Sequence, residues 1–349
     1  MQTDSHHHLT IHDGWRRVLE RAGFNLSGLG LLLVLCLTPL FVHDEFILRL
    51  LISAMMFAAL AVAFDFTAGF INIVNFGFAA FWGMGAYTSG LLVVKLGWSP
   101  WLAMPAGAVT AGILGFVLGL LTIRLGGIFA SCMTWFVALA MLSAAGNMVD
   151  LTSGHAGMTV PLLFETVQNW PYFYLMLAIM IAIYILVTAI IKSNVGMAFK
   201  AIGQDIEAAA ASGVNAVRYK VMNFTISCAL AGLIGGFYAH FIGILTPTVM
   251  HTSHTVEVLA MAYIGGRGTI WGPLVSAMIM VPVMEFLKNL MEFRLILYGA
   301  MMIFVMIYYP KGMVGIWQTV AGSLGKMRHA GDPEGCPPSL PHEHSNYIK

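Results

Sequence analysis

The stretch KSNVGMAFKAIGQDIEAAAASGVN, residues 192–215, is polar and basic, and it interrupts a chain that is otherwise almost continuously apolar. The polar loop extends to Lys220 and lies between two long apolar blocks. The run from Ile206 to Ala211 is rich in alanine, the best helix former, and Gly213 is placed to end a helix. We therefore expect a short helix at a membrane surface, where it is accessible to a soluble partner.

The composition indicates the class of protein. Hydrophobic residues make up 59% of the 349 residues, charged residues only 9%, and the mean hydropathy is +0.83. A soluble domain carries about 25% charged residues, so this chain is an integral membrane protein. A net charge of +1 gives no reason to expect nucleic acid as a partner. The cysteines at 36, 132, 228 and 336 have no paired spacing, so we expect neither a disulfide framework nor a metal site.

Ten apolar segments are candidates for membrane spans, since a helix needs about 20 apolar residues to cross a bilayer. The eighth segment is too short to cross fully, and we interpret it as a broken or re-entrant helix packed inside protein. The pattern predicts an all-α polytopic transmembrane bundle of about 8–10 spans. The candidate segments are 26–43, 46–66, 75–94, 99–122, 126–148, 171–191, 220–244, 254–265, 269–288 and 294–310.

The placement of lysine and arginine predicts the orientation. With the N-terminus inside, most of these residues fall on the inner side, including those of the 192–220 loop. The expected organisation is a cytoplasmic N-terminal segment over 1–25, a transmembrane domain over 26–317 and a cytoplasmic tail over 318–349. Both termini are then inside, and the tail, rich in Pro, Gly and His, is expected to be disordered.

The stretch from Asp65 to Tyr87 is the best candidate for the lining of a translocation pathway, because glycines and asparagines interrupt an apolar run there. Asparagine is costly in lipid unless it faces protein, water or ligand, and a broken helix frees backbone groups for a polar solute. Alternatively, Asn72 and Asn75 cap helix ends and bond to neighbouring helices, and Asp65 points toward the membrane interface. The candidates are Asp65, Gly69, Asn72, Asn75, Gly77, Gly83, Gly85 and Tyr87.

Two further segments lie between spans. A glycine block after the short eighth segment favours a tight turn, with a pore gate or a motor contact as the alternative. A second segment, expected on the external side, is either a docking point or entrance for an external donor or a plain solvated loop. The glycine block contains Gly265, Gly266, Gly268, Gly272 and Pro273, and the external segment contains Thr152, Gly154 and Gly157.

No catalytic pattern is present in the sequence. It has no GxxxxGK[ST] phosphate loop, no HExxH or GxSxG motif and no paired catalytic carboxylates. We expect neither enzymatic activity nor a cofactor, so any ATP would be bound by a separate polypeptide. An ion-coupled secondary transporter is a second hypothesis and predicts buried carboxylates in mid-span, for which Asp65 and Glu257 are the candidates. A membrane enzyme is a third, but the clusters of His, Asp or Cys that it predicts are not visible.

Five blocks, in order, resemble the permease subunits of branched-chain amino acid ABC importers, a superfamily that also includes urea, ribose and nucleoside permeases. The resemblance covers about residues 46–317. Departures include Asn72 and Asn75, which stand where amino acid permeases often have Gln and Ser, and Ser153, which replaces a glycine. The blocks are Gly69–Tyr87, Thr152–Gly157, Ala201–Asn215, Ile264–Pro273 and Tyr308–Gly315.

The resemblance implies a multi-pass protein of a bacterial inner membrane. Its implied partners are a second homologous permease subunit, two cytoplasmic ATPase subunits and a periplasmic substrate-binding protein. The helix from Ile206 to Gly213 would seat in an ATPase cleft, so that ATP-driven closure switches the pore. The implied solute is a branched-chain or related amino acid, with urea, an amide or another small solute as the alternative. The implied coupling residues are Ile202, Asp205, Glu207, Ala208, Ala209 and Gly213.

Overall fold

The computed structural model describes residues 44–286, apart from 124, 126, 165 and 167, together with positions 38, 39, 296, 299, 300, 303, 304, 307, 312 and 313. The expected first and last spans, 26–43 and 294–310, lie outside the described residues except at isolated positions. The same holds for the N-terminal segment 1–25, the tail 318–349 and most of the closing block Tyr308–Gly315.

Each of the eight expected spans in the described part corresponds to a helix, so the all-α polytopic bundle is confirmed. Five helices are long and apolar enough to cross a membrane. The short eighth segment is a 14-residue helix that follows a 3-10 turn, as expected for a broken span. The helices are α3 (Glu45–Ala68), α4 (Phe78–Leu96), α5 (Pro100–Ile123), α6 (Ile128–Asn147), α8 (Trp170–Lys192), α11 (Ala216–Ile242), α12 (Thr252–Gly265) and α13 (Trp271–Phe286).

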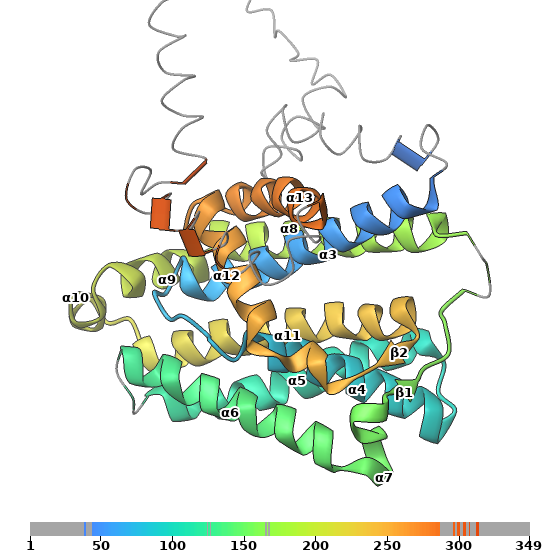
Figure 1. Cartoon of the computed structure of the whole chain (residues 1–349). Helices are drawn as coiled ribbons and strands as arrows, with labels where there is room; N and C mark the ends of the chain where they lie inside the picture. Colours follow the sequence, from blue (N-terminus) through green and yellow to red (C-terminus); the bar gives the residue numbers. More distant parts are fainter. Residues whose placement is uncertain are drawn as a thin grey trace, which may run out of the picture.

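The bundle has two layers that α12 connects (Figure 1). Helices α3, α8 and α13 pack together in one layer, and α4, α5 and α11 form the centre of the other. Helix α12 runs obliquely between them and contacts α3, α4, α6 and α13. The main hydrophobic core fills this arrangement and includes the fully buried Phe64, Phe173 and Phe224.

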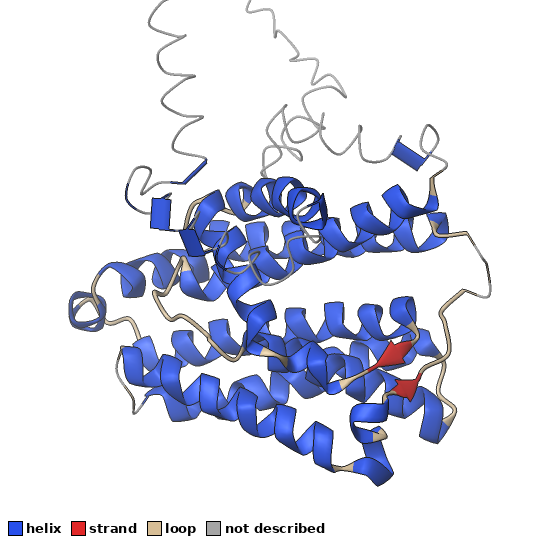
Figure 2. Ribbon diagram, in the orientation of Figure 1, coloured by secondary structure: helices blue, strands red, loops and turns tan. Residues whose placement is uncertain are grey.

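The two ends of the bundle carry different structures (Figures 1 and 2). One end, which we call the coupling end, carries α9 (Asn194–Gln204) and α10 (Ile206–Ala211). The opposite end, the strand end, carries α7 (Val149–Thr152), η1 (Gly154–Ala156) and a small antiparallel sheet of β1 (Met158–Thr159) and β2 (Ile244–Leu245). The 3-10 turn η2 (Pro247–Met250) follows β2 and contacts α4 and α6. The 192–220 loop and the 150–169 segment therefore lie at opposite ends, while N-in/C-in orientation stays a prediction.

Close helix packing depends on small residues where backbones meet, as expected for helices in lipid. A Cβ on Gly85 of α4 would overlap the backbone of Gly232 on α11. A Cβ on Gly235 of α11 would overlap the carbonyl oxygen of Trp82 and lie 2.9 Å from the amide nitrogen of Ala86. The contact between α4 and α11 is thus backbone against backbone, with no room for a methyl group.

We predict that Gly235→Ala destabilises the protein, because the added methyl group must displace α4. Overpacking of this kind costs about 1–3 kcal/mol. The unfolding temperature in detergent, followed by loss of monodisperse protein, should fall. Gly299→Ala is the matched control, since none of the described residues has an atom within 4 Å of its added Cβ. Equal unfolding temperatures for the two variants would contradict the packing argument.

Candidate functional site

The coupling end is built around an arm of two helices, α9 and α10, which we call the coupling arm. Asp205 separates them in an extended conformation and caps α10, since its Oδ1 accepts the N–H groups of Glu207 (2.8 Å) and Ala208 (3.1 Å). Gly213 follows α10 with a φ of +82° and open space around it, so its backbone conformation is what requires glycine there. The short alanine-rich helix was predicted, whereas α9 as a separate helix was not.

The predicted coupling residues divide between the two faces of the arm. Ile202 and Ala209 are buried and hold the arm against the bundle. Glu207, Ala208 and the flanking Ile206 are exposed, and Ile206 is 45% exposed although it is large and apolar. The arm thus presents a surface of small and apolar side chains beside one carboxylate. Their role in coupling stays a prediction.

Helix α9 is fixed to the bundle by rings and by a close backbone approach. The buried Phe199 packs edge-on against Phe66 of α3, with ring centroids 5.5 Å apart, and against Tyr219 of α11. Gly203 lies directly over the carbonyl oxygen of Phe70, where a Cβ would overlap that atom. Only glycine allows α9 to approach the segment that follows α3 this closely.

A side-chain junction at the coupling end connects three parts of the bundle. Asn72 adopts a left-handed φ of +61°, and its Nδ2 donates to the carbonyl oxygen of Gly203 at 2.6 Å. Its Oδ1 accepts a hydrogen bond from Arg267, which also donates to the carbonyl oxygen of Ala68 at 3.1 Å. We call Asp65, Asn72, Gly203, Arg267 and Gly268 the junction. It connects the coupling arm, the end of α3 and the turn between α12 and α13.

Asp65 occupies the buried centre of this junction, with 1% of its surface exposed. Both of its carboxylate oxygens accept the backbone N–H of Gly268, at 3.0 and 3.2 Å. Gly69 packs against the same carboxylate and against the Gly268 nitrogen, leaving no space for a side chain. The structure therefore places Asp65 as a fixed partner of the α12–α13 turn, while its role in translocation stays a prediction.

The last carbonyl groups of α3 receive partners although the helix ends inside the bundle. A helix leaves its last four carbonyls without intrahelical donors. The carbonyl oxygens of Asp65 and Thr67 accept N–H groups of the following residues Gly69 and Ile71. Asn223 of α11 donates to Phe66 O at 2.8 Å, and Arg267 supplies the donor for Ala68. Neither Asn223 nor Arg267 was predicted as a site residue. The position of Arg267 between two glycines of the glycine block was a signal that could have identified it.

The start of α4 is capped in the same manner. Asn75 is buried, and its Oδ1 accepts the N–H of Gly77 at 3.0 Å. Thr255 of α12 accepts the N–H of Ala79 at 3.0 Å, so a side chain of one broken helix satisfies a backbone donor of the other. The contacts of Asn72 and Asn75 are those of the alternative interpretation, in which they serve helix ends and neighbouring elements.

The other pathway candidates lie at helix contacts. Gly77 packs on the carbonyl oxygen of Thr134, Gly83 on the Met250 side chain, and Gly85 on the α11 backbone. Tyr87 is buried near the strand end, and its hydroxyl has no hydrogen-bond partner in the described part of the chain. These residues are not gathered at the junction, and a role in solute passage stays a prediction.

The glycine block forms a tight turn. Gly266 and Gly268 have φ values of +117° and +70°, which glycine adopts readily. Gly265 packs against the backbone of Gly272 and the nitrogen of Pro273, and the distant Gly312 packs on Gly266. The turn interpretation thus matches the geometry, and it lies within the junction rather than apart from it.

The predicted external residues lie at the strand end, away from the junction (Figure 1). Thr152 donates to the carbonyl oxygen of Ala145 at 2.6 Å, closing α6 against α7. Gly154 and Gly157 both have left-handed φ values, of +56° and +86°. Pairing of β1 with β2, two residues each, was not predicted, because such short strands carry no periodic signal.

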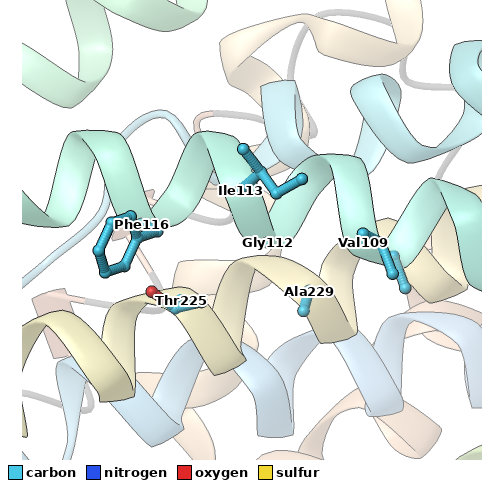
Figure 3. A pocket seen from close by; sticks show the side chains of 7 residues that line it. Val109, Gly112, Ile113, Phe116, Thr225 and Ala229 are labelled. Carbon is cyan, nitrogen blue, oxygen red and sulfur yellow. The ribbon is translucent and has the colours of Figure 1, made fainter.

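A shallow groove of about 450 Å³ runs along the surface between α5 and α11 (Figure 3). Its one hydroxyl, on Thr225, already donates to Val221 O at 2.8 Å, so the groove offers little to a polar solute. Among the described residues, no group of three or more His, Cys, Asp or Glu is placed to hold a metal. The groove is lined by Ala108, Val109, Gly112, Ile113, Phe116, Thr225 and Ala229.

Comparisons with known proteins identify relatives of this chain. Residues 46–306 match the family described as "Branched-chain amino acid transport system / permease component". The chain is 24% identical to the high-affinity branched-chain amino acid transport system permease protein LivM of Escherichia coli (strain K12), over 74% of this chain and 68% of that protein. It is 24% identical to LivH of the same organism, over 74% of this chain and 91% of that protein.

A more distant similarity reaches the autoinducer 2 import system permease protein LsrC of Yersinia enterocolitica, serotype O:8 / biotype 1B. That match is 27% identical and covers 64% of this chain and 56% of that protein. No solved structure matches the chain.

We predict that Asn72→Gly loosens α9 without straining the backbone, because glycine accepts the φ of +61° while both side-chain hydrogen bonds are lost. A hydrogen bond contributes about 0.5–1.5 kcal/mol, so hydrogen exchange of the α9 amides should accelerate by up to roughly tenfold. Asn147→Gly, which removes a bond within α6 alone, is the control. Unchanged exchange in α9 would show that the junction does not hold the arm.

Proposed function

We infer, because this chain belongs to the family of branched-chain amino acid transport permease components, that it is the membrane-spanning subunit of an ABC importer. Its solute is then small and polar, and a branched-chain or related amino acid is the class that the names of its relatives support. In this proposal the chain forms the pathway, and ATP is bound and hydrolysed by separate subunits.

The observation that carries the proposal is the coupling arm. Helix α10 projects at one end of the bundle with Ala208 exposed, and small side chains permit close approach of a partner. The arm is also tied to the membrane helices, because Gly203 bonds to Asn72 and Asn72 bonds to Arg267. An element that is exposed on one side and bonded to broken helices on the other suits the transmission of a partner's movement.

The proposed mechanism begins at α10. Closure of an ATPase pair displaces the coupling arm, and the junction carries the displacement to the end of α3 and the turn after α12. Since α12 lies between the two layers of the bundle, its movement would alter their spacing and switch access between the two membrane faces. Differential contacts of the ATPase with the two states supply the free energy.

The complete importer would contain a second homologous permease subunit, two ATPase subunits and a periplasmic binding protein in a bacterial inner membrane. The family supports these partners. Urea, an amide or another small solute is the alternative cargo, in keeping with the similarity to an autoinducer 2 permease.

The first experiment is purification of the tagged chain from native membranes, followed by mass spectrometry. We expect recovery of a second permease and an ATPase with a phosphate-binding loop. Recovery of this chain alone, together with solute uptake into vesicles without ATP, would overturn the proposal and favour an ion-coupled carrier.

We predict that Ala208→Glu abolishes solute-stimulated ATPase activity of the assembled complex and leaves membrane insertion intact. Residue 208 is the third position of α10 after the Asp205 cap, where glutamate stabilises a helix start, so any loss reflects the partner contact and not melting of α10. We expect at least a roughly tenfold loss of stimulated activity, equivalent to about 1.4 kcal/mol of coupling.

The matched control is Ala156→Glu, which adds the same charge at an exposed position of the strand end. Its effect on recovery of the ATPase subunits should be negligible. A second variant, Gly213→Pro, removes the N–H that donates to Ala210 O and forbids the positive φ. Normal coupled transport by both Ala208→Glu and Gly213→Pro would contradict the assignment of α10.

A further inference from the structure

A cluster of rings and polar groups lies where α12 passes between the two layers, and we call it the mid-bundle cluster. It consists of Phe57 of α3, Trp82 of α4, Tyr238 of α11, and His254 and Glu257 of α12. Trp82 is central, because its ring lies 6.2 Å from that of Phe57, 4.8 Å from that of Tyr238 and 5.4 Å from that of His254. Four helices from both layers thus meet around one indole ring.

The cluster contains a buried hydrogen-bond acceptor, Glu257, whose partner His254 is partly exposed. Glu257 is 6% exposed, and its Oε2 lies 3.1 Å from Nδ1 of His254. The His254 side chain is 28% exposed, so one side of the imidazole is accessible, while its other contacts are to the rings of Trp82 and Phe57.

The same cluster contains a buried donor that is not used. Trp82 is 2% exposed, and its Nε1–H has no hydrogen-bond partner among the residues that the structure describes. Buried donors are almost always paired, because an unpaired donor loses its bonds to water without replacement. The indole group of Trp82 therefore requires an explanation that packing alone does not give.

We propose that the mid-bundle cluster is a weak binding site for the zwitterionic head group of an amino acid in transit. The ammonium group donates to Glu257 in place of His254 and lies against the surrounding aromatic rings, which attract cations. The carboxylate accepts the Trp82 Nε1–H, and an apolar side chain packs against Phe57. This inference rests on the proposed function and deepens it by assigning the solute's chemical class to particular residues.

The chemistry of the cluster favours an amino acid over the other solutes of the superfamily. A buried carboxylate among aromatic rings matches a cation, whereas a neutral solute such as urea would gain a hydrogen bond to the carboxylate but neither the ion pair nor the cation–π contacts. Binding is expected to be weak because the ammonium replaces a donor that Glu257 already has. Asp65, by contrast, has both oxygens bonded to a backbone N–H of the junction, which makes it a structural carboxylate in this state.

The test uses the complete importer in proteoliposomes, with ATP inside and radiolabelled leucine delivered by the binding protein. Trp82→Phe removes the unpaired N–H together with one ring of the indole, so some fall in the unfolding temperature is expected from lost packing, and uptake is compared at equal amounts of folded complex. Maximal leucine uptake should fall roughly tenfold, the effect of losing about one charge-assisted hydrogen bond. Trp98→Phe, which alters an exposed indole between α4 and α5, should leave uptake unchanged.

Glu257→Gln should cause a similar loss of maximal uptake, with the half-saturating leucine concentration unchanged, because the binding protein sets that concentration. Glu285→Gln makes the same chemical change near the end of α13 and serves as its control. Leucine uptake within twofold of wild type in both cluster variants would overturn the site. Absence of leucine uptake by the wild-type complex would instead overturn the proposed function, and the ligand class with it.

Discussion

The structure depends on one constraint, which is that backbone polar groups inside a bilayer must find partners within the protein. Uninterrupted helices satisfy it by themselves, but this chain breaks its helices after α3 and on both sides of α12. The breaks are closed by side chains from elsewhere: Asn223 and Arg267 bond to the last carbonyls of α3, and Thr255 bonds to the start of α4. The main role of these polar side chains is therefore to supply partners for the backbone groups at the helix breaks.

The side chains that close these breaks are shared, and the breaks are consequently not independent. Arg267 serves the end of α3 and also Asn72, which in turn serves the coupling arm through Gly203. The bonds of Asn72 to Gly203 and to Arg267 lie at exposed positions, so moving the arm alone would exchange them for bonds to water, at about 0.5–1.5 kcal/mol for each bond. The shared partners therefore couple movement of the arm to the end of α3 and to the turn after α12.

Much of the fold could be predicted from the sequence, because the length and apolarity of a helix are local properties. The eight described spans and the alanine-rich helix before Gly213 were of this kind. The partners of polar residues could not be predicted, because Asn72 and Gly203 lie 131 positions apart and only tertiary packing brings them together. For Asn75, the alternative of a helix cap agreed with its contacts, whereas Trp82 gave no signal, since a tryptophan in an apolar run is ordinary.

Helix α12 carries polar groups of the mid-bundle cluster near its start, and polar groups of the junction follow directly after its end. His254 and Glu257 lie in its first turns, and Arg267 and Gly268 lie just beyond its last residue. Its 14 residues span about 21 Å, so a contact at its start and a contact at the junction move together. If a solute binds the first turns more tightly in one arrangement than in the other, it also biases the junction and the arm. Linkage is reciprocal, so a partner that moves the arm must alter the affinity for the solute by the same factor, and a weak site at mid-bundle is sufficient for such coupling.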